Sequence, residues 1–405
     1  MTQPIIIVGA GHAAGQFIIS LRAEGCDTPV ILIGDERHPP YQRPPLSKQY
    51  LAGEVGLDRV YLRPADWYAA QGVECLAGRR TIVINREGGT VSLDDGRILA
   101  YSTLVLATGA RPRPLPLPGA ELDGVFTLRG IDDADRLRER FVPGKRLVLI
   151  GGGYIGLEVA ATARKRGLTV TVLEADVRVL SRVAASAISK FFEGTHRAQG
   201  VDLRTGVKIA RIGRAAGALA VCLEGGESIP ADTVVTGIGI VPNTELAGEA
   251  GLGIENGIAV DAYLRTADPR IFAIGDCASF PSAVYGRRVR LESVQNAASQ
   301  GRIAAMAIAG KPQPYDEVPS FWSEQYDVRL NIAGLSQGHD ETVLRGQPDS
   351  GRFSVFYLKA GRLLAVDAVN SPAEFVSSKK LIAERMPVNK PRLADPAVPV
   401  PEATA

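Results

Sequence analysis

The chain has 405 residues, of which 45% are hydrophobic and 22% charged, and its 46 basic and 44 acidic residues leave a formal net charge of +2. This length suits two or three domains rather than one core, and the near balance of charge disfavours a nucleic-acid-binding protein. The first apolar run stops at a glycine after a few residues, so we expect no signal sequence, no membrane span and a cytoplasmic location.

The first recognisable unit begins with "PIIIVGAGHAAG" at residues 4–15. It predicts a strand, a glycine turn and a helix start, followed by an amphipathic helix and a second strand, so the unit is β-α-β. Gly9, Gly11 and Ala14 have the spacing of a dinucleotide-binding fingerprint, in which the turn lets a pyrophosphate approach unpaired helix amides. We therefore expect a nucleotide site near the N-terminus.

The next segment predicts hairpin strands and then a linker. Turns are expected at Gly88-Gly89 and Asp95-Gly96, and a buried strand should end at Thr108-Gly109. The closely spaced prolines of "RPRPLPLPG", residues 111–119, exclude a helix and indicate a domain boundary.

A second unit of the same kind follows the linker. "RLVLIGGGYIGLEVA", residues 146–160, places Gly151, Gly153 and Gly156 between an apolar strand and a helix. One fingerprint can arise by chance in a glycine-rich chain, but two in full β-α-β context predict two bound nucleotides.

Each unit also offers an acid for a ribose. In the first unit it is Asp35 or Glu36, and we favour Asp35; in the second, Glu174 follows Gly153 by 21 positions, close to the expected spacing. The alternative is that Glu174 merely ends a strand in solvent. Because a carboxylate repels a 2′-phosphate and no arginine follows directly, we expect NADH rather than NADPH.

The remaining chain predicts a return to the first domain and then a third domain. A strand over 270–274 and a helix of small residues over 293–310 start no new fingerprint, and from residue 313 alternating strands, with a turn at Ala360-Gly361, precede a helix near 372–385. The proline-rich end should be extended or disordered. The predicted domains are 1–110 with 243–312 for the first nucleotide, 111–242 for the second, and 313–405 as a C-terminal α+β domain with an extended tail.

Several runs together resemble one protein family: "RPPLSKQYL" at 43–51, "LVLATGARPRPLP" at 104–116, the second fingerprint, "IGDCA" at 274–278 and "FWSEQYD" at 321–327. They are similar to the FAD-dependent, NADH-consuming ferredoxin reductases of bacterial cytochrome P450 systems, over all but the tail. The resemblance implies an α/β fold with two Rossmann-like dinucleotide-binding domains, as in glutathione-reductase-like flavoproteins, plus a C-terminal α+β domain.

The resemblance also implies site residues. For FAD these are Gly9, Gly11, Ala13 and Ala14 at the pyrophosphate, Asp35 at the ribose, Thr81 at the adenine through its backbone, Arg43 and Lys48 on the flavin side, Arg129 in the linker, Asp276 at the ribityl chain and Val294 at the flavin ring. For NADH they are Gly151, Gly153, Tyr154, Ile155, Gly156, Glu174, Arg182 and Gly239. Arg182 is also explained as a surface arginine.

Three residues are implied to take part in the reaction itself. Lys48 would place an ammonium near flavin N5, and Glu158, two residues after Gly156, can pair with it. Trp322 would lie at the flavin edge where a protein partner docks, or else is a packing tryptophan. We assign none of the four histidines to catalysis; His12 falls inside the first phosphate turn, and His38, His196 and His339 read as surface residues.

Neither a metal site nor a thiol relay is expected. Cys26, Cys75, Cys222 and Cys277 are far apart, and the segment "YQRPPLSKQY", where disulfide-reducing relatives carry reactive cysteines, has none. Electrons would therefore leave through the flavin itself.

The predicted function is transfer of a hydride from NADH to FAD and of single electrons to an acidic [2Fe-2S] ferredoxin that feeds a cytochrome P450. Alternatives are a reductase for a rubredoxin or for the ferredoxin of a Rieske dioxygenase, and an NADH-binding flavoprotein that senses redox state or acts through its surfaces. A basic patch of Arg287, Arg288, Arg290 and Arg302 is a candidate docking site for the ferredoxin, and a solvated hairpin explains the same arginines.

Overall fold

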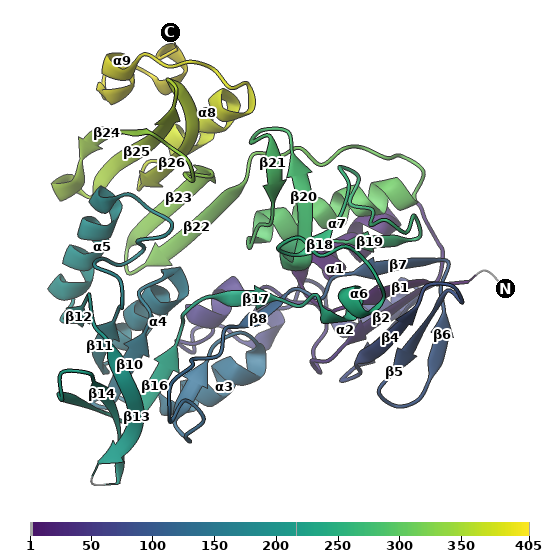
Figure 1. Cartoon of the computed structure of the whole chain (residues 1–405), viewed down its shortest axis with the longest axis horizontal. Helices are drawn as coiled ribbons and strands as arrows, with labels where there is room; N and C mark the ends of the chain where they lie inside the picture. Colours follow the sequence, from purple (N-terminus) through teal and green to yellow (C-terminus); the bar gives the residue numbers. More distant parts are fainter. Residues whose placement is uncertain (1–2, 216, 405) are drawn as a thin grey trace. The chain divides into compact units, whose positions relative to one another are not determined.

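The computed structural model describes residues 3–215 and 217–404. The chain forms two compact units (Figure 1). Unit 1 holds the chain up to Arg43, Gly56–Arg111 and Val241–Pro319; unit 2 holds Pro44–Val55, Pro112–Ile240 and the chain from Ser320 onward. No helix within these described residues is long and apolar enough to cross a membrane. The three-domain division expected from the sequence stays a prediction.

Unit 1 is built on a parallel five-stranded sheet of order β19-β7-β1-β2-β3. Its strands are β1 (Ile5–Val8), β2 (Val30–Gly34), β3 (Val73–Ala77), β7 (Thr103–Leu106) and β19 (Ile271–Ala273). Because β19 pairs with β7, the chain does return to the first sheet, as its lack of a new fingerprint indicated.

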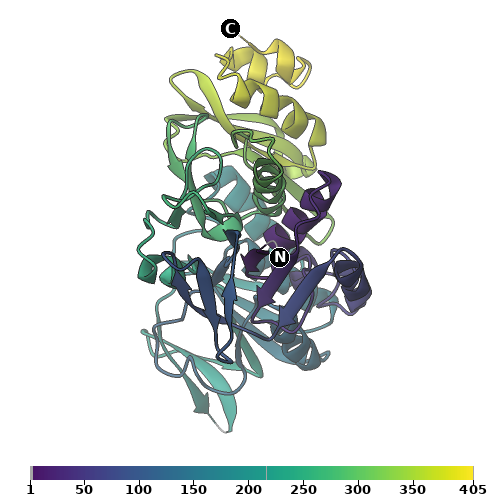
Figure 2. The same ribbon diagram turned by 90° about the vertical axis from the view of Figure 1, so that its right-hand side faces the viewer.

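Two helices of unit 1, α1 (His12–Ala23) and α7 (Val294–Ile308), pack side by side (Figure 1, Figure 2). A Cβ on Gly301 would lie 2.7 Å from the backbone oxygen of Ala13, so the small residue is what lets the helices approach. The other elements of unit 1 are η2 (Leu57–Arg59), α2 (Ala65–Ala70), the hairpin strands β4 (Thr81–Asn85), β5 (Thr90–Leu93) and β6 (Ile98–Ala100), α6 (Glu245–Glu249), β18 (Ile258–Ala259), η3 (Gly275–Cys277), β20 (Ala278–Ser282) and β21 (Arg287–Val289).

Unit 2 contains the second parallel sheet, of order β12-β11-β10-β16-β9. Its strands are β9 (Val125–Thr127), β10 (Arg146–Ile150), β11 (Thr169–Leu173), β12 (Asp202–Arg204) and β16 (Thr233–Thr236). The accompanying elements are η1 (Pro44–Ser47), α3 (Ile131–Arg140), α4 (Tyr154–Lys165), α5 (Ser186–Ala198) and the antiparallel strands β13 (Ile209–Ala215), β14 (Ala218–Leu223) and β15 (Ser228–Ala231). The short strands β8 (Ala110–Pro112) and β17 (Ile240–Pro242) lie where the chain passes from one unit to the other.

The C-terminal part of unit 2 is an antiparallel sheet of order β22-β23-β26-β25-β24, with helix α8 packed against β23 and β26 (Figure 1). The elements are β22 (Ser320–Gln325), β23 (Val328–Gly334), β24 (Glu341–Gln347), η4 (Pro348–Ser350), β25 (Arg352–Lys359), β26 (Arg362–Val369) and α8 (Pro372–Ala383). The predicted turn between β25 and β26 is present, with φ of 49° at Ala360 and 72° at Gly361.

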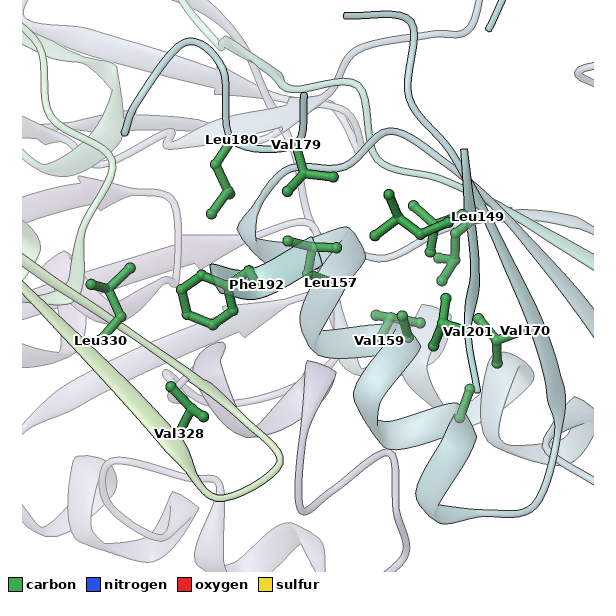
Figure 3. Packing of buried hydrophobic residues seen from close by; sticks show 14 of the residues in the cluster. Leu149, Leu157, Val159, Val170, Val179, Leu180, Phe192, Val201, Val328 and Leu330 are labelled. Atoms are coloured by element: carbon green, nitrogen blue, oxygen red, sulfur yellow. The ribbon is translucent and has the colours of Figure 1, made fainter. Parts of the chain in front are cut away.

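One hydrophobic core joins the second parallel sheet to the C-terminal sheet. Figure 3 shows Leu157 of α4 and Phe192 of α5 together with Val328 and Leu330 of β23. Burial of each such side chain contributes about 1.5–3 kcal/mol, so this shared core ties the β22–β23 hairpin firmly to α4 and α5.

The end of the chain differs from the extended tail expected from its prolines. It forms α9 (Lys390–Ala394) and η5 (Val400–Glu402), with Arg345 of β24 buried beneath it. The Arg345 guanidinium donates hydrogen bonds to the backbone oxygens of Leu393, Asp395, Pro396 and Val398, at 3.2, 2.7, 3.3 and 2.8 Å. The proline-rich tail has few backbone N–H groups, so Arg345 binds it through its backbone oxygens.

Candidate functional site: two nucleotide cradles and a buried ion pair

The turn between β1 and α1 in unit 1 is shaped for a phosphate. Gly9 has a φ of 103°, and a Cβ there would lie 2.2 Å from the backbone oxygen of Ala107, so no other residue fits. A Cβ on Gly11, which caps α1, would meet no heavy atom within 4 Å in the described chain, so the helix N-terminus is open. An exposed helix N-terminus behind a glycine turn accommodates a pyrophosphate, and this arrangement fits the phosphate end of FAD.

His12 lies in the same turn. Its Nδ1 atom is buried and has no hydrogen-bond partner among the described residues, and burial lowers its pKa. The negative charge of Asp276 raises that pKa by a smaller amount. A Cβ on Gly275 would lie 3.1 Å from Ala13, so the turn and η3 are in close contact. Ala13, Ala14 and Asp276 thus gather at one end of the first sheet.

The structure distinguishes the two candidate ribose acids of unit 1. Glu36 accepts a hydrogen bond from Arg43 at 2.7 Å and another from the Tyr41 hydroxyl, so both of its oxygens are engaged. Asp35 directly follows β2 and is exposed, with Arg80 at 3.6 Å. The exposed Asp35 carboxylate is accessible to a ligand hydroxyl, whereas that of Glu36 is engaged, and the assignment of Asp35 to the ribose stays a prediction. Arg43 is held against Glu36 and Tyr41.

Two further residues of unit 1 stand at the ends of elements. Thr81 begins β4 and is buried, with its hydroxyl unpartnered within residues 3–215 and 217–404. Val294 is the first residue of α7, after Ser293, whose side chain caps the helix by accepting from the backbone N–H of Asn296. Both positions are compatible with the roles that the resemblance implies, which stay proposals.

The turn between β10 and α4 in unit 2 repeats the first cradle. Gly151 has a φ of 109°, with an added Cβ 2.5 Å from the Gly237 oxygen, and a Cβ on Gly156 would lie 2.4 Å from the Gly151 oxygen. Around Gly153, which caps α4, the described chain leaves open space. Glu174 accepts hydrogen bonds from the backbone N–H groups of Gly152 at 2.6 Å and Asp176 at 2.8 Å. The acid is therefore fixed beside the glycine turn, as a ribose-binding acid must be.

The other residues expected at NADH are spread over unit 2. Tyr154 begins α4, and its ring lies against that of Phe321 at a tilt of 40° with the ring centroids 4.9 Å apart, whereas Ile155 is exposed. Arg182 lies exposed in the segment between β11 and α5. Gly239 has a φ of 108° and accepts the Arg113 N–H at 2.9 Å. Arg129 follows β9, where its backbone N–H is bonded to Asp133.

The pair predicted between Lys48 and Glu158 is present. Lys48 Nζ lies 2.7 Å from Glu158 Oε2, and the two side chains are 11% and 2% exposed. Ser47 donates to the same oxygen at 2.6 Å, and Ser323 donates to Glu158 Oε1 at 2.7 Å. Sequence reasoning missed both serines, although Ser47 and Ser323 lie inside the quoted runs "RPPLSKQYL" and "FWSEQYD".

Trp322 precedes Ser323 on β22 and is half-buried. Because side chains alternate along a strand, Trp322 points away from the face that carries Ser323 and Glu158. Trp67, by contrast, packs edge-on against Tyr68 with ring centroids 5.1 Å apart.

The prediction that His196 lies at the surface was wrong. His196 is 0% exposed and is bonded to Gln325 at 2.8 Å and to the Tyr326 hydroxyl at 3.1 Å. It shares one face of α5 with the buried Ile188 and Phe192, at a spacing of four residues. His339 is exposed, and His38 is half-buried beside Tyr61.

The arginines of the candidate basic patch are largely neutralised within unit 1. Ion pairs join Arg288 to Glu255 at 3.2 Å, Arg290 to Glu292 at 2.7 Å and Arg302 to Glu317 at 2.9 Å; Arg287 is exposed in β21. This pattern favours the interpretation as a hairpin stabilised by local ion pairs over that of a basic docking patch.

The four cysteines, which all lie within the described residues, form no disulfide. All four are free, and burial raises the pKa of the Cys277 thiol, which donates to backbone oxygens of Leu106 and Ile274. Across the described ranges, no cluster of histidine, cysteine or acidic residues could hold a metal ion.

Two parallel sheets, each with a glycine cradle open to a phosphate, and an antiparallel C-terminal sheet define a flavoprotein reductase fold that binds two nucleotides. Residues 3–301 match the model of the pyridine nucleotide-disulphide oxidoreductase family, and residues 320–404 match that of the reductase C-terminal domain. The chain belongs to this family, as a member of its ferredoxin reductase group. It is an FAD-binding enzyme that uses NADH.

The chain is similar to putidaredoxin reductase of Pseudomonas putida, with 46% identity over 407 residues that cover 99% of this chain and 96% of the relative. Among solved structures, it is similar to the covalent putidaredoxin reductase–putidaredoxin complex, with a TM-score of 0.96, 45% identity and coverage of 99% of this chain and 98% of that chain. It is also similar to the ferredoxin reductase for the CYP199A2 system from Rhodopseudomonas palustris, with a TM-score of 0.95, 42% identity and full coverage of both chains. The likeness thus includes the tail, contrary to expectation.

Proposed function

We propose that this protein takes a hydride from NADH onto FAD and passes single electrons to a [2Fe-2S] ferredoxin that serves a cytochrome P450. The observation that carries the proposal is the combination of two glycine cradles with a buried Lys48–Glu158 pair. The similar solved structures include a reductase in complex with putidaredoxin and a reductase of a CYP199A2 system.

In this proposal the first unit holds FAD and the second unit holds NADH. Gly9, Gly11, Ala13 and Ala14 receive the FAD pyrophosphate, and Asp35 the ribose. Thr81, Arg43, Arg129, Asp276 and Val294 make the further FAD contacts that the resemblance implies. Bound FAD supplies the chemistry, because it accepts two electrons as hydride and releases them one at a time. The domain limits 1–110 with 243–312, 111–242 and 313–405 are part of this proposal.

For NADH, the proposal assigns phosphate binding to the turn of Gly151, Gly153 and Gly156. Glu174, fixed by two backbone N–H groups, still has lone pairs for the ribose hydroxyls and repels a 2′-phosphate. Other contacts come from Tyr154, Ile155, Arg182 and Gly239.

Lys48 and Glu158 are the proposed residues at the reacting atoms. The ammonium of Lys48 favours electron density arriving on a neighbouring flavin, and Glu158 holds that ammonium in place through the 2.7 Å contact. Trp322 is proposed to lie where the ferredoxin docks. We further propose a cytoplasmic location, because NADH is a coenzyme of that compartment.

The visible spectrum of the purified protein and rapid mixing test this function. The protein should carry oxidised flavin that bleaches with NADH and much less with NADPH, and a [2Fe-2S] ferredoxin should reoxidise it within seconds. Faster reoxidation by a rubredoxin or by a Rieske-type ferredoxin would assign the protein to one of those systems instead. A reduced flavin that persists with all three acceptors would show an NADH-binding interaction protein and refute the reductase.

A further inference from the structure

The Glu158 carboxylate is the end point of a longer chain of hydrogen bonds inside unit 2. Ser323, which donates to Glu158 Oε1 at 2.7 Å, itself accepts from Gln325 Nε2 at 3.2 Å. Gln325 Oε1 lies 2.8 Å from His196 Nε2, and His196 Nδ1 lies 3.1 Å from the Tyr326 hydroxyl. Ser323, Gln325 and His196 are 0%, 1% and 0% exposed. Three elements, α4, β22 and α5, are therefore linked through buried polar groups.

The direction of every hydrogen bond in this chain follows from donor counting. Ser323 has one hydroxyl proton, which the Glu158 carboxylate must receive, so the serine oxygen accepts from the Gln325 amide nitrogen. The Gln325 oxygen then faces His196, whose Nε2 must carry a proton. Burial lowers the pKa of His196, so the ring is neutral and its Nδ1 accepts from Tyr326. All four donors point toward Glu158.

A chain of this kind positions a charge rather than conducting a proton. The Gln325 amide interrupts any proton relay, because an amide exchanges its protons too slowly to pass one along. Aligned donors, however, polarise one another and strengthen the last bond, the one to the carboxylate. Together with Lys48 and Ser47 on Oε2, Ser323 leaves Glu158 with donors on both oxygens.

The ion pair is largely buried, but it borders a pocket that solvent can enter. A pocket of about 560 Å³ in unit 2 is lined by Lys48, Glu158, Thr162 and Tyr326, among others. Water in that pocket competes for both charges, and a carboxylate held on one oxygen alone can rotate toward it. The serine bond on Oε1 opposes that rotation.

From this geometry we propose that Ser323, Gln325 and His196 are positioning residues that fix Glu158, and through it the Lys48 ammonium, for the reaction with flavin and nicotinamide. The inference rests on the proposed function. A purely structural role, in which His196 merely fastens the β22–β23 hairpin to α5, predicts loss of stability without change at the flavin.

Ser323→Ala tests the last bond of the chain. Losing a hydrogen bond to a charged group should slow flavin reduction by saturating NADH about tenfold, with the half-saturating NADH concentration unchanged within about twofold. The reduced flavin should also become about tenfold less favoured, a midpoint potential about 30 mV lower for this two-electron couple. The matched control is Ser354→Ala, another buried serine of the C-terminal sheet whose hydroxyl has no partner within the described chain. It should change neither quantity.

His196→Phe and His196→Gln test the start of the chain. Phenylalanine keeps a ring but no donor, and it should lower the reduction rate about threefold; glutamine keeps an N–H for Gln325 and should restore most of that loss. Wild-type rate and potential in both Ser323→Ala and His196→Phe would refute the proposal. Equal reduction rates in His196→Gln and His196→Phe would also refute the proposal.

A measurement on the wild-type protein avoids the risk that a variant does not fold. Nitrogen-15 NMR of histidine-labelled protein, with the His196 signals assigned by their loss in His196→Gln, should show a neutral His196 ring at pH 7 with the proton on Nε2. A proton on Nδ1 would reverse the chain and overturn the inference. If instead NADH fails to reduce the wild-type flavin at all, the proposed function fails, whatever the tautomer.

Discussion

Replacing Asp367 with asparagine removes a buried carboxyl from the centre of the C-terminal sheet. Asp367 is 1% exposed on β26 and accepts a hydrogen bond from the Tyr357 hydroxyl. Tyr357 in turn accepts the backbone N–H of Ala185 at 2.8 Å. Burial raises the pKa of Asp367 from 3.8 to about 7. Between about pH 4 and pH 7, the folded protein therefore keeps a proton that the unfolded chain has released.

The sign of the effect follows from that difference. The contribution of Asp367 to stability is fully present below its unfolded pKa of 3.8 and is lost as the pH rises through about 7. At 1.36 kcal/mol per pH unit, the loss amounts to about 4 kcal/mol at pH 8. Asparagine keeps the shape and the acceptor oxygen for Tyr357 but has no charge to bury. Asp367→Asn should therefore match the wild type near pH 4 and exceed its free energy of unfolding by up to about 4 kcal/mol at pH 8.

Urea unfolding of the flavin-loaded protein at several pH values, followed by circular dichroism and flavin fluorescence, measures this difference. Asp349→Asn is the matched control, because Asp349 is exposed in η4 and its replacement removes the same charge from the surface. Two stability curves that run parallel for wild type and Asp367→Asn from pH 4 to pH 8 would show that Asp367 is ionised in the folded state and refute the reasoning.

Three other changes test the cradles and the tail. Gly9→Ala would place a Cβ 2.2 Å from the Ala107 oxygen, so the purified protein should contain little FAD. The ratio of flavin absorbance to protein absorbance measures the FAD content. A full complement of flavin would contradict the assignment of this turn to FAD. Glu174→Gln removes the charge that repels a 2′-phosphate, so the half-saturating NADH concentration should rise about tenfold. Reductive titrations should also show a smaller preference for NADH over NADPH. An unchanged preference would mean that a residue other than Glu174 excludes NADPH. Arg345→Met leaves four backbone oxygens without their buried donor, so the free energy of unfolding measured in urea should fall by about 3 kcal/mol. A decrease of less than about 1 kcal/mol would mean that water replaces the guanidinium as the donor.

The sequence was sufficient where a contact follows from local spacing. The glycines of both fingerprints predicted the β-α-β units, and the turn at Gly361 followed from a single glycine between alternating strands. The pairing of Lys48 with Glu158 was also predictable, but through the family resemblance, because 110 residues separate the two side chains.

What the sequence did not show was the set of buried polar contacts between distant elements. Ser323 and Gln325 lie two residues apart on one face of β22, and nothing nearby in the sequence indicates that Glu158 and His196 lie across from them. For His196 a signal did exist, since it continues the apolar face formed by Ile188 and Phe192. The residue type alone favours an exposed His196, whereas its place in the helical pattern of α5 indicates that it is buried.

The hydrophobic core shared by α4, α5 and the C-terminal sheet has a consequence for protein engineering. A chimera that exchanges β22 to β26 between related reductases, in order to redirect electrons to another carrier, would join surfaces that never evolved together around Phe192 and Leu330. Such a transplant should succeed when the residues of α5 travel with the sheet, and should misfold when the graft junction is drawn at the start of β22 alone.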